Sequence, residues 1–104
     1  MARRKPVTPK LRISEQVAGL IRNTHPELKR KIRTALENIQ EEPHSGKQLK
    51  DELIGLRSYR VSRLRIIYRI RSSKVIDIIT IGPRRIIYEE TYRLIKKDEK
   101  ENLP

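Results

Sequence analysis

The segment from Leu64 to Arg71 alternates between apolar and basic side chains, and this alternation constrains the fold more than any other part of the chain. Successive side chains of a β-strand point to opposite faces, so the pattern predicts a strand with one apolar face. The apolar face carries Leu64, Ile66, Tyr68 and Ile70, and the other face carries Arg65, Ile67, Arg69 and Arg71. A polar turn then leads into residues 75–81, which are apolar almost throughout and predict a strand covered on both faces.

A third strand is predicted at residues 56–62, where Tyr59 and Val61 share one face and Arg60 lies on the other. The three segments together predict an antiparallel meander. A further short strand is expected within residues 8–13, which alternate in the same way. The loop before the meander is expected to bury three apolar anchors, namely Leu49, Leu53 and Ile54.

Two helices are predicted between the N-terminal strand and the meander. Ser14 is expected to cap the first helix. Thr24 is expected to cap the second, with Glu27 at the capping-box spacing, and Pro43 ends it. A third helix is expected over residues 86–97. The sequence therefore predicts an α+β protein, in which a small antiparallel sheet (an N-terminal strand plus a three-stranded meander) packs against an N-terminal helical hairpin, with a short C-terminal helix.

The length of 104 residues is enough for one domain with one modest core. We expect a basic, flexible arm at residues 1–7, a single domain at residues 8–97 and a polar tail at residues 98–104. The absence of cysteine excludes disulfides and thiolate metal sites. No apolar run is long enough to span a membrane and no secretory signal is evident, so we expect a cytoplasmic protein.

Basic charge is concentrated in the predicted meander. Residues 57–85 hold nine Arg and Lys side chains against one acid, Asp77, and so account for +8 of the chain's net charge of +12. Arginine suits phosphate because its planar guanidinium donates two hydrogen bonds to two oxygens and stays charged at any relevant pH. We therefore expect the arginines to be exposed on one face of the sheet, free of carboxylates from the same chain, and to bind a polyanion such as RNA.

Other chemistries have few candidate residues. His25 and His44 are the two histidines, and neither has the spaced carboxylates of a metal site. His44 and Ser45 are adjacent in sequence, which is not how a nucleophile and its base are arranged. The four glycines form no glycine-rich loop that would cradle a mononucleotide. We expect no metal, no small-molecule cofactor and no membrane partner.

Two motifs of the meander carry a resemblance to a known family. The first reads Tyr59-Arg60-Val61-Ser62-Arg63-Leu64-Arg65-Ile66-Ile67-Tyr68-Arg69-Ile70. The second reads Ile79-Thr80-Ile81-Gly82-Pro83-Arg84-Arg85-Ile86-Ile87-Tyr88. In order and spacing they resemble the strand pair and the closing Gly-His-Arg-Arg element of the RelE/ParE superfamily, the bacterial and archaeal toxins of toxin–antitoxin modules. The resemblance covers residues 8–95 and implies the same α+β layout.

The resemblance implies one of two activities. RelE-like toxins cut mRNA in the ribosomal A site without a metal, and ParE-like toxins inhibit DNA gyrase without cutting. Under the RelE interpretation, Arg65 would hold the scissile phosphate and Arg84 would stabilise or protonate the leaving oxygen. Arg60 would be the basic residue of the preceding strand. Tyr88 would stack on or orient a base, and Tyr92, one helical turn later, is the alternative for this role. The remaining residues expected to bind RNA are Arg57, Arg63, Arg69, Arg71, Arg85 and Tyr92.

Two positions depart from the RelE pattern. Ser62 stands where a second lysine is often found, and Pro83 replaces the histidine of the closing element, so no general base is assigned. The leading hypothesis is an mRNA-cleaving toxin whose partners are the ribosome, mRNA and an acidic antitoxin. The alternatives are a ParE-like gyrase inhibitor and a catalytically decayed module that only binds its antitoxin.

Overall fold

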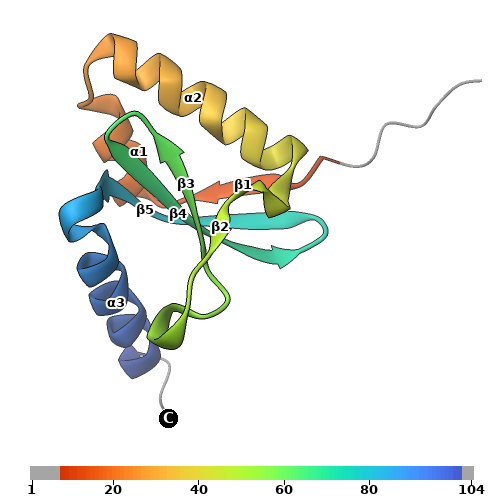
Figure 1. The fold of residues 1–104 in the computed structure, drawn as a ribbon, viewed down its shortest axis with the longest axis vertical. Helices are drawn as coiled ribbons and strands as arrows, with labels where there is room; N and C mark the ends of the chain where they lie inside the picture. The colour runs from red at the N-terminus through yellow and green to blue at the C-terminus, as the bar shows by residue number, and fades with distance from the viewer. Residues whose placement is uncertain (1–7, 102–104) are drawn as a thin grey trace, which may run out of the picture.

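A five-stranded sheet with the strand order β1-β5-β4-β3-β2 forms the centre of the protein (Figure 1). The computed structural model describes residues 8–101, with the side chains of residues 8–97, so the predicted arm at residues 1–7 lies outside the described residues. The strands are β1 (Lys10–Ile13), β2 (Lys47–Gln48), β3 (Arg57–Val61), β4 (Leu64–Ser72) and β5 (Val75–Pro83). The predicted α+β class is confirmed.

The predicted meander is confirmed, because β3 pairs with β4 and β4 pairs with β5, both antiparallel. The N-terminal strand β1 joins the sheet in parallel with β5, where Arg12 lies opposite Asp77. The sequence did not indicate this parallel pair, because two helices and three strands separate the partners. The two-residue strand β2 was not predicted either, and it forms the far edge of the sheet beside β3.

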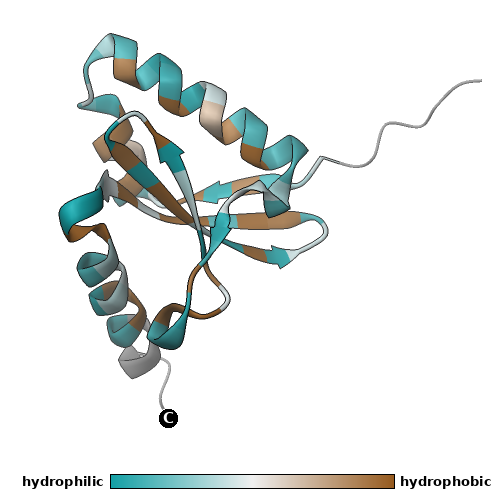
Figure 2. Ribbon diagram, in the orientation of Figure 1, coloured by the Kyte–Doolittle hydropathy of each residue, from teal (hydrophilic) through white to brown (hydrophobic). Residues whose placement is uncertain are grey.

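Two helices cover one face of the sheet. Helix α1 (Glu15–Arg22) and helix α2 (Pro26–Glu41) form the predicted hairpin, and their apolar stripes turn toward the strands (Figure 2). The core on this side contains Ile32 and Ile39 of α2 together with Ile66 of β4, all of which are at most 1% exposed. This burial explains why a chain with 36% hydrophobic residues folds around an aliphatic core.

The helix caps confirm one prediction and correct another. The Ser14 side chain accepts a hydrogen bond from the Val17 amide and caps α1, as expected. The prediction that Thr24 caps α2 is wrong, because the Thr24 hydroxyl donates to the Leu20 carbonyl at the end of α1. His25 is the cap instead, and its Nδ1 accepts from the Glu27 amide.

Helix α3 (Arg84–Glu101) lies on the opposite side of the sheet from α1 and α2 (Figure 1). It begins two residues earlier than predicted and continues into the segment expected to be a polar tail. Ile87 of α3 packs with Leu56 and with Ile67 of β4 in a second, smaller core. The consecutive residues Ile66 and Ile67 are both 0% exposed, so the middle of β4 is buried on both of its faces.

Two short 3-10 helices, η1 (Pro43–Ser45) and η2 (Asp51–Leu53), shape the loop before the meander. Leu49 and Leu53 pack beside the second core, as predicted for buried anchors. The same prediction is wrong for Ile54, which is 80% exposed. Ile54 follows the η2 turn and immediately precedes Gly55, whose φ of 92° lies in the left-handed region.

Tyr68 ties η1 to the sheet. Its hydroxyl donates a hydrogen bond to the Pro43 carbonyl at 2.6 Å and accepts one from the Gly46 amide at 2.9 Å. The side chain is fully buried, and this burial raises the pKa of Tyr68 above its ordinary value, although the Gly46 hydrogen bond partly opposes the shift. A Cβ at Gly46 would collide with the hydroxyl and would lie 2.8 Å from Cε1 of the ring.

We predict that Gly46→Ala destabilises the protein while Gly19→Ala does not. Gly46 has an ordinary φ of −72°, so its substitution tests the collision with Tyr68 and not backbone strain. At Gly19, in α1, the nearest atom to an added Cβ is 3.7 Å away, and alanine should stabilise the helix by about 0.5–1 kcal/mol. Urea unfolding measures both, and equal stability of the two variants would contradict the close packing at Gly46.

We predict that Tyr68→Phe lowers the free energy of unfolding at neutral pH by roughly 1–3 kcal/mol, because two buried polar groups lose their partner. The difference should shrink above about pH 10. There the unfolded wild type ionises its tyrosine before the folded state does, so stability falls as the pH rises toward the raised folded pKa. Urea midpoints from pH 8 to 11 test this, and a constant difference between the two proteins would refute it.

Candidate functional site

Arg60 of β3 and Arg65 of β4 lie directly opposite each other in the antiparallel pair. Side chains at such positions are about 4.5–5.5 Å apart at Cβ and share one face of the sheet. Arg60 is exposed and its Nε donates to the Ser62 carbonyl at 3.4 Å, while Arg65 is half-buried. Two like charges held opposite each other destabilise a strand pair unless solvent or an anion relieves them.

The β4–β5 register brings Arg84 to the same end of the sheet. Gly82 lies opposite Arg65, and α3 begins two residues later at Arg84. A Cβ at Gly82 would lie 3.0 Å from Cδ1 of Ile87, so glycine permits the close approach of the strand end to the first turn of α3. We call Arg60, Arg65 and Arg84 the upper arginine group. It is assembled from three segments that are not adjacent in sequence.

The electrostatics of this group are unfavourable in the protein alone. The first turn of α3 carries no acidic residue, and both Arg84 and Arg85 are exposed there. A helix N-terminus is partly positive, so each cation costs about 0.3–1 kcal/mol at that position. The ion pairs found among the side chains of residues 8–97 involve none of the three upper arginines. An anion bound between them would relieve the repulsion.

The two tyrosines of α3 differ in their accessibility. Tyr88 is half-buried beside the second core, and its hydroxyl oxygen lies 3.5 Å from Oγ of Ser58 on β3. Tyr92, one turn later, is 39% exposed, and the Lys96 ammonium lies 5.5 Å from its ring centroid. Tyr92 is therefore the more exposed of the two tyrosines, and Lys96 lies over its ring.

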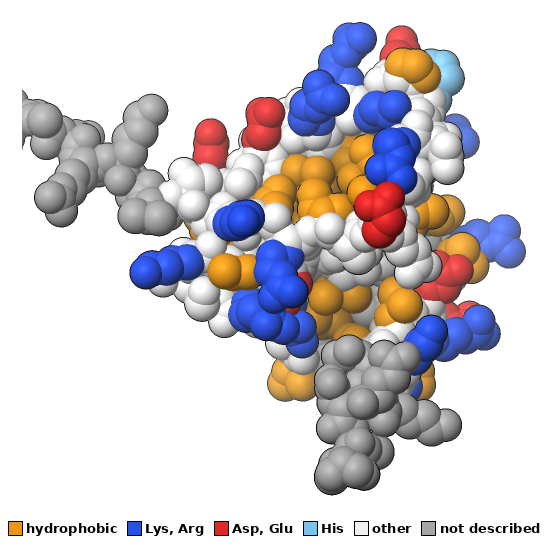
Figure 3. Space-filling view, turned by 180° about the vertical axis from the view of Figure 1, so that it is seen from behind, with side chains coloured by type: hydrophobic (Ala, Val, Ile, Leu, Met, Phe, Trp, Pro, Cys, Tyr) orange, Lys and Arg blue, Asp and Glu red, His pale blue; other side chains and the backbone are white. Residues whose placement is uncertain are grey.

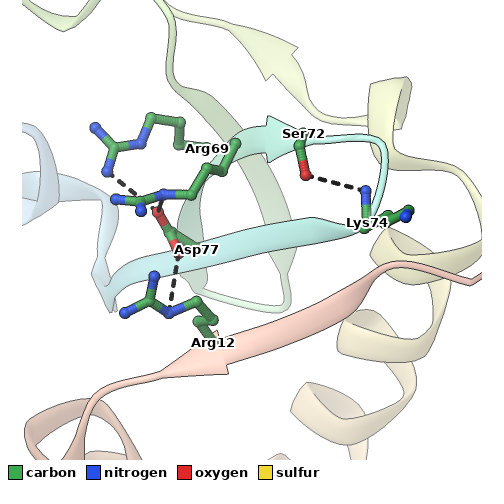
Figure 4. Close-up of polar contacts among 6 residues, drawn as sticks. Arg12, Arg69, Ser72, Lys74 and Asp77 are labelled. Atoms are coloured by element: carbon green, nitrogen blue, oxygen red, sulfur yellow. Dashed lines mark hydrogen bonds and ion pairs between the residues drawn. The ribbon is translucent and has the colours of Figure 1, made fainter.

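A second group of arginines surrounds Asp77 at the other end of the same face (Figure 4). Arg69 Nη2 and Arg71 Nε donate to Oδ2 of Asp77 at 3.1 Å and 2.9 Å, and Arg12 Nε lies 3.8 Å from Oδ1. We call Arg12, Arg69, Arg71 and Asp77 the lower arginine group. The expectation that Arg69 and Arg71 are free of carboxylates from the same chain is therefore wrong, since Asp77 pairs with both.

The remaining predicted RNA-binding arginines lie elsewhere. Arg57 is opposite Tyr68 on the face covered by α2, and its Nη1 donates to the carbonyls of His44 and Gly46 at 3.0 Å and 2.8 Å. Arg63 is exposed in the turn between β3 and β4, next to Ser62, which has a positive φ of 56°. The predicted arginines thus occupy several parts of the molecule and do not form a single surface.

Sequence reasoning missed three basic residues near these groups. Arg12 joins the lower arginine group only because β1 pairs in parallel with β5. Arg30 and Lys31 of α2 line a pocket of about 340 Å³ together with Arg60 and Tyr59. No sequence signal marked Arg12, whereas the exposed face of the predicted second helix could have placed Arg30 and Lys31 close to the sheet.

The histidines and the helices were compared with the requirements of a metal site and of a membrane span. His25 caps α2, and the backbone carbonyl of His44 accepts from Arg57. Within the described residues, no three His, Cys, Asp or Glu side chains lie close enough together to hold a metal ion. In the same part of the chain, no helix has the length and apolar character needed to cross a membrane.

Comparisons with known proteins match this fold and these motifs. Residues 11–88 match the sequence family described as the ParE toxin of the type II toxin–antitoxin system parDE. A search of curated proteins finds no match.

Three solved structures show the similarity of fold. The toxin of a RelBE toxin–antitoxin complex from Mycobacterium tuberculosis superposes with a TM-score of 0.65 and 25% sequence identity, covering 75% of this chain and 100% of that one. An arginine double mutant of the Escherichia coli toxin RelE in the free state superposes with a TM-score of 0.67 and 19% sequence identity, covering 88% of this chain and 98% of that one. A chain of the archaeal RelE–RelB complex from Pyrococcus horikoshii superposes with a TM-score of 0.59 and 24% sequence identity, covering 75% of this chain and 97% of that one.

We predict that Asp77→Asn lowers the free energy of unfolding by roughly 1–3 kcal/mol, because three guanidinium groups lose their shared carboxylate. The loss should be smaller at about 500 mM salt than at about 50 mM, since salt screens the repulsion between the arginines. Glu37→Gln, on the exposed face of α2, is the matched control. Chemical unfolding of both variants at the two salt concentrations provides the measurement, and an equally small effect in both would contradict the role of Asp77.

Proposed function

Because the chain belongs to the ParE toxin family of type II toxin–antitoxin systems, we propose that it acts as a ribosome-dependent endoribonuclease that cleaves mRNA in the A site. One observation carries the proposal. The upper arginine group has three arginines at one end of the sheet, and none of them is in an ion pair among the side chains of residues 8–97. Phosphate is the ligand that such a group suits best.

The proposed reaction joins the 2′-hydroxyl oxygen of one nucleotide to the adjacent phosphorus and breaks the bond to the 5′-oxygen of the next nucleotide. The products are a cyclic phosphate and a 5′-hydroxyl. Arg65, flanked by Arg60, would stabilise the extra negative charge on the phosphate as the new bond forms. Arg84, at the start of α3, would stabilise the charge that develops on the leaving oxygen.

Proton transfer needs a different source. Arginine hardly ever gives up its proton and is a poor general base. The two histidines are not part of the upper arginine group. His25 caps α2, and His44 lies in η1, which Tyr68 ties to the sheet. We therefore assign to solvent or to the ribosome both the acceptance of the 2′-hydroxyl proton and the donation of a proton to the leaving 5′-oxygen. This assignment fits a toxin that cleaves slowly without the ribosome.

The charge of the protein supports the proposed partners. A net charge of +12 favours association with the phosphate-rich ribosome and its mRNA. The same charge favours an acidic antitoxin, which would hold the toxin inactive by covering its basic surfaces. Two of the similar structures are complexes of RelE-type toxins with their antitoxins.

A second candidate function is inhibition of DNA gyrase, and the description of the matched family favours it. The departures at Ser62 and Pro83 remove proton-transfer groups and are compatible with a toxin that binds without cutting. A supercoiling assay distinguishes the two functions, in which plasmid is incubated with purified gyrase and the protein. Accumulation of relaxed or cleaved plasmid would favour gyrase inhibition, and unchanged supercoiling with new mRNA ends would favour the nuclease.

We predict that Arg65→Ala and Arg84→Ala each reduce mRNA cleavage by roughly 10²–10³-fold, because each removes a donor aimed at developing charge. Primer extension on mRNA from translating ribosomes measures the new 5′ ends. Arg65→Lys should restore only part of the activity, since an ammonium lacks the planar fork.

Arg33→Ala is the matched control, because Arg33 is exposed on α2 and does not line the pocket that contains Arg60. Circular dichroism should show all four variants folded. Wild-type cleavage by both alanine variants of the upper group would remove these arginines from the mechanism.

A further inference from the structure

A pocket of about 340 Å³ lies between α2 and the end of β3. Arg30 and Lys31 line it from α2, and Tyr59 and Arg60 line it from β3. We call it the α2–β3 pocket. Because Arg60 also belongs to the upper arginine group, the pocket adjoins the site proposed for the scissile phosphate.

The charges of the α2–β3 pocket are all positive. Its lining holds three cations, Arg30, Lys31 and Arg60, and no acidic residue. All three residues are exposed, and the ion pairs among the side chains of residues 8–97 include none of them. Cations that gather without a carboxylate repel one another, and a bound anion relieves this repulsion.

Neutral polar side chains add hydrogen-bonding groups to the α2–β3 pocket, which is also lined by Thr34, Asn38, Tyr59 and Ser62. The Tyr59 hydroxyl accepts a hydrogen bond from Nδ2 of Asn38 at 3.2 Å, so its own hydrogen remains available to a ligand. Hydroxyl and amide groups, together with Arg and Lys, are the side-chain groups that proteins use to contact the phosphates and sugars of nucleic acids.

The aliphatic part of the lining distinguishes between two classes of anionic partner. Its two aliphatic residues, Ala35 and Val61, are only 4% and 6% exposed. They therefore offer little surface to the Leu or Ile side chains of an acidic protein segment. A phosphodiester needs only charge and hydrogen bonds from its site, so nucleic acid matches this lining better.

We propose that the α2–β3 pocket binds a phosphate of single-stranded RNA next to the phosphate that lies between Arg60 and Arg65. Arg30 and Lys31 donate to the oxygens of this second phosphate, and Arg60 lies between the two phosphates. The inference rests on the proposed function, because one RNA strand runs from the upper arginine group into the pocket. Arg30 and Lys31 bind the strand and take no part in the bond-breaking step.

Fluorescence anisotropy with the full-length protein and labelled ten-nucleotide 2′-O-methyl RNAs tests the site, because these RNAs lack the attacking hydroxyl and cannot be cleaved by the proposed reaction. We expect Arg30→Gln and Lys31→Gln each to weaken binding roughly tenfold, since each removes a charged donor to phosphate. The loss should be the same for an all-adenine and an all-uracil RNA, because a phosphate contact carries no sequence information.

The salt dependence of binding provides a second measurement on the same proteins. For the double variant Arg30→Gln and Lys31→Gln, one phosphate contact is lost. The slope of the logarithm of the binding constant against the logarithm of the salt concentration should therefore become shallower by about 0.7. An unchanged slope, or weakening confined to one of the two RNAs, would contradict a phosphate contact in the pocket.

Arg33→Gln is the matched control, because it removes the same charge from an exposed position of the same helix outside the pocket. Basic side chains also lie at several separate places on the side of the molecule that Figure 3 shows, so any lost charge weakens the general attraction to RNA slightly. Equal weakening by Arg30→Gln and Arg33→Gln would overturn the proposal, as would the absence of RNA binding by the wild type.

A synthetic peptide of five Ser–Glu repeats is the control for the class of partner. Dependence on Arg30 for binding of the peptide but not of the RNA would overturn the proposal in favour of an acidic protein segment. A failure of the nuclease proposal has a different signature. Primer extension would then show no new mRNA ends with the wild type, while the uncleavable RNAs would still bind and depend on Arg30.

Discussion

The burial of β4 on both faces determines where charge can lie on this sheet. Along the face that meets α3, β4 carries Arg65, then Ile67, then Arg69 and Arg71. Ile67 is fully buried against Ile87 of α3, so the helix covers the middle of a face that is otherwise basic. The cations are excluded from the covered region because an unpaired charge is costly to bury. They are therefore divided between the two ends of the strand.

The two ends differ in one carboxylate. At the lower end, Asp77 pairs with three arginines and holds them beside an aliphatic pocket. At the upper end, Arg60 faces Arg65 directly and Arg84 begins α3, and the ion pairs of the described side chains include none of them. The positive charges of the upper group are thus unpaired among the described side chains, whereas those of the lower group are partly neutralised by Asp77. The same fold presents both because α3 separates them.

Several particular residues show how far local patterns predicted this structure. Alternation predicted the buried Tyr68 on β4 and, in the pattern of residues 56–62, the exposed Arg60 on β3. Ser14 caps α1 as its position indicated. The capping-box spacing favoured Thr24, but the cap is His25, because the Thr24 hydroxyl bonds to the preceding helix. Ile67 interrupts the run of arginines on its face, and this interruption was a signal that another element covers the strand.

What the sequence by itself determined is local in origin. Three local patterns predicted the strands and helices: the period of two along β4, the apolar stripes of α1 and α2, and the chain-breaking Pro43. Each of them depends on residues only a few positions apart, as do the two family motifs. Only the tertiary structure decided which charges meet. The parallel pairing of β1 with β5 brings Arg12 to Asp77 across 64 intervening positions, and the packing of α3 on Ile67 divides the arginines. Such contacts depend on strand order and on the direction of a helix, which no short sequence pattern encodes.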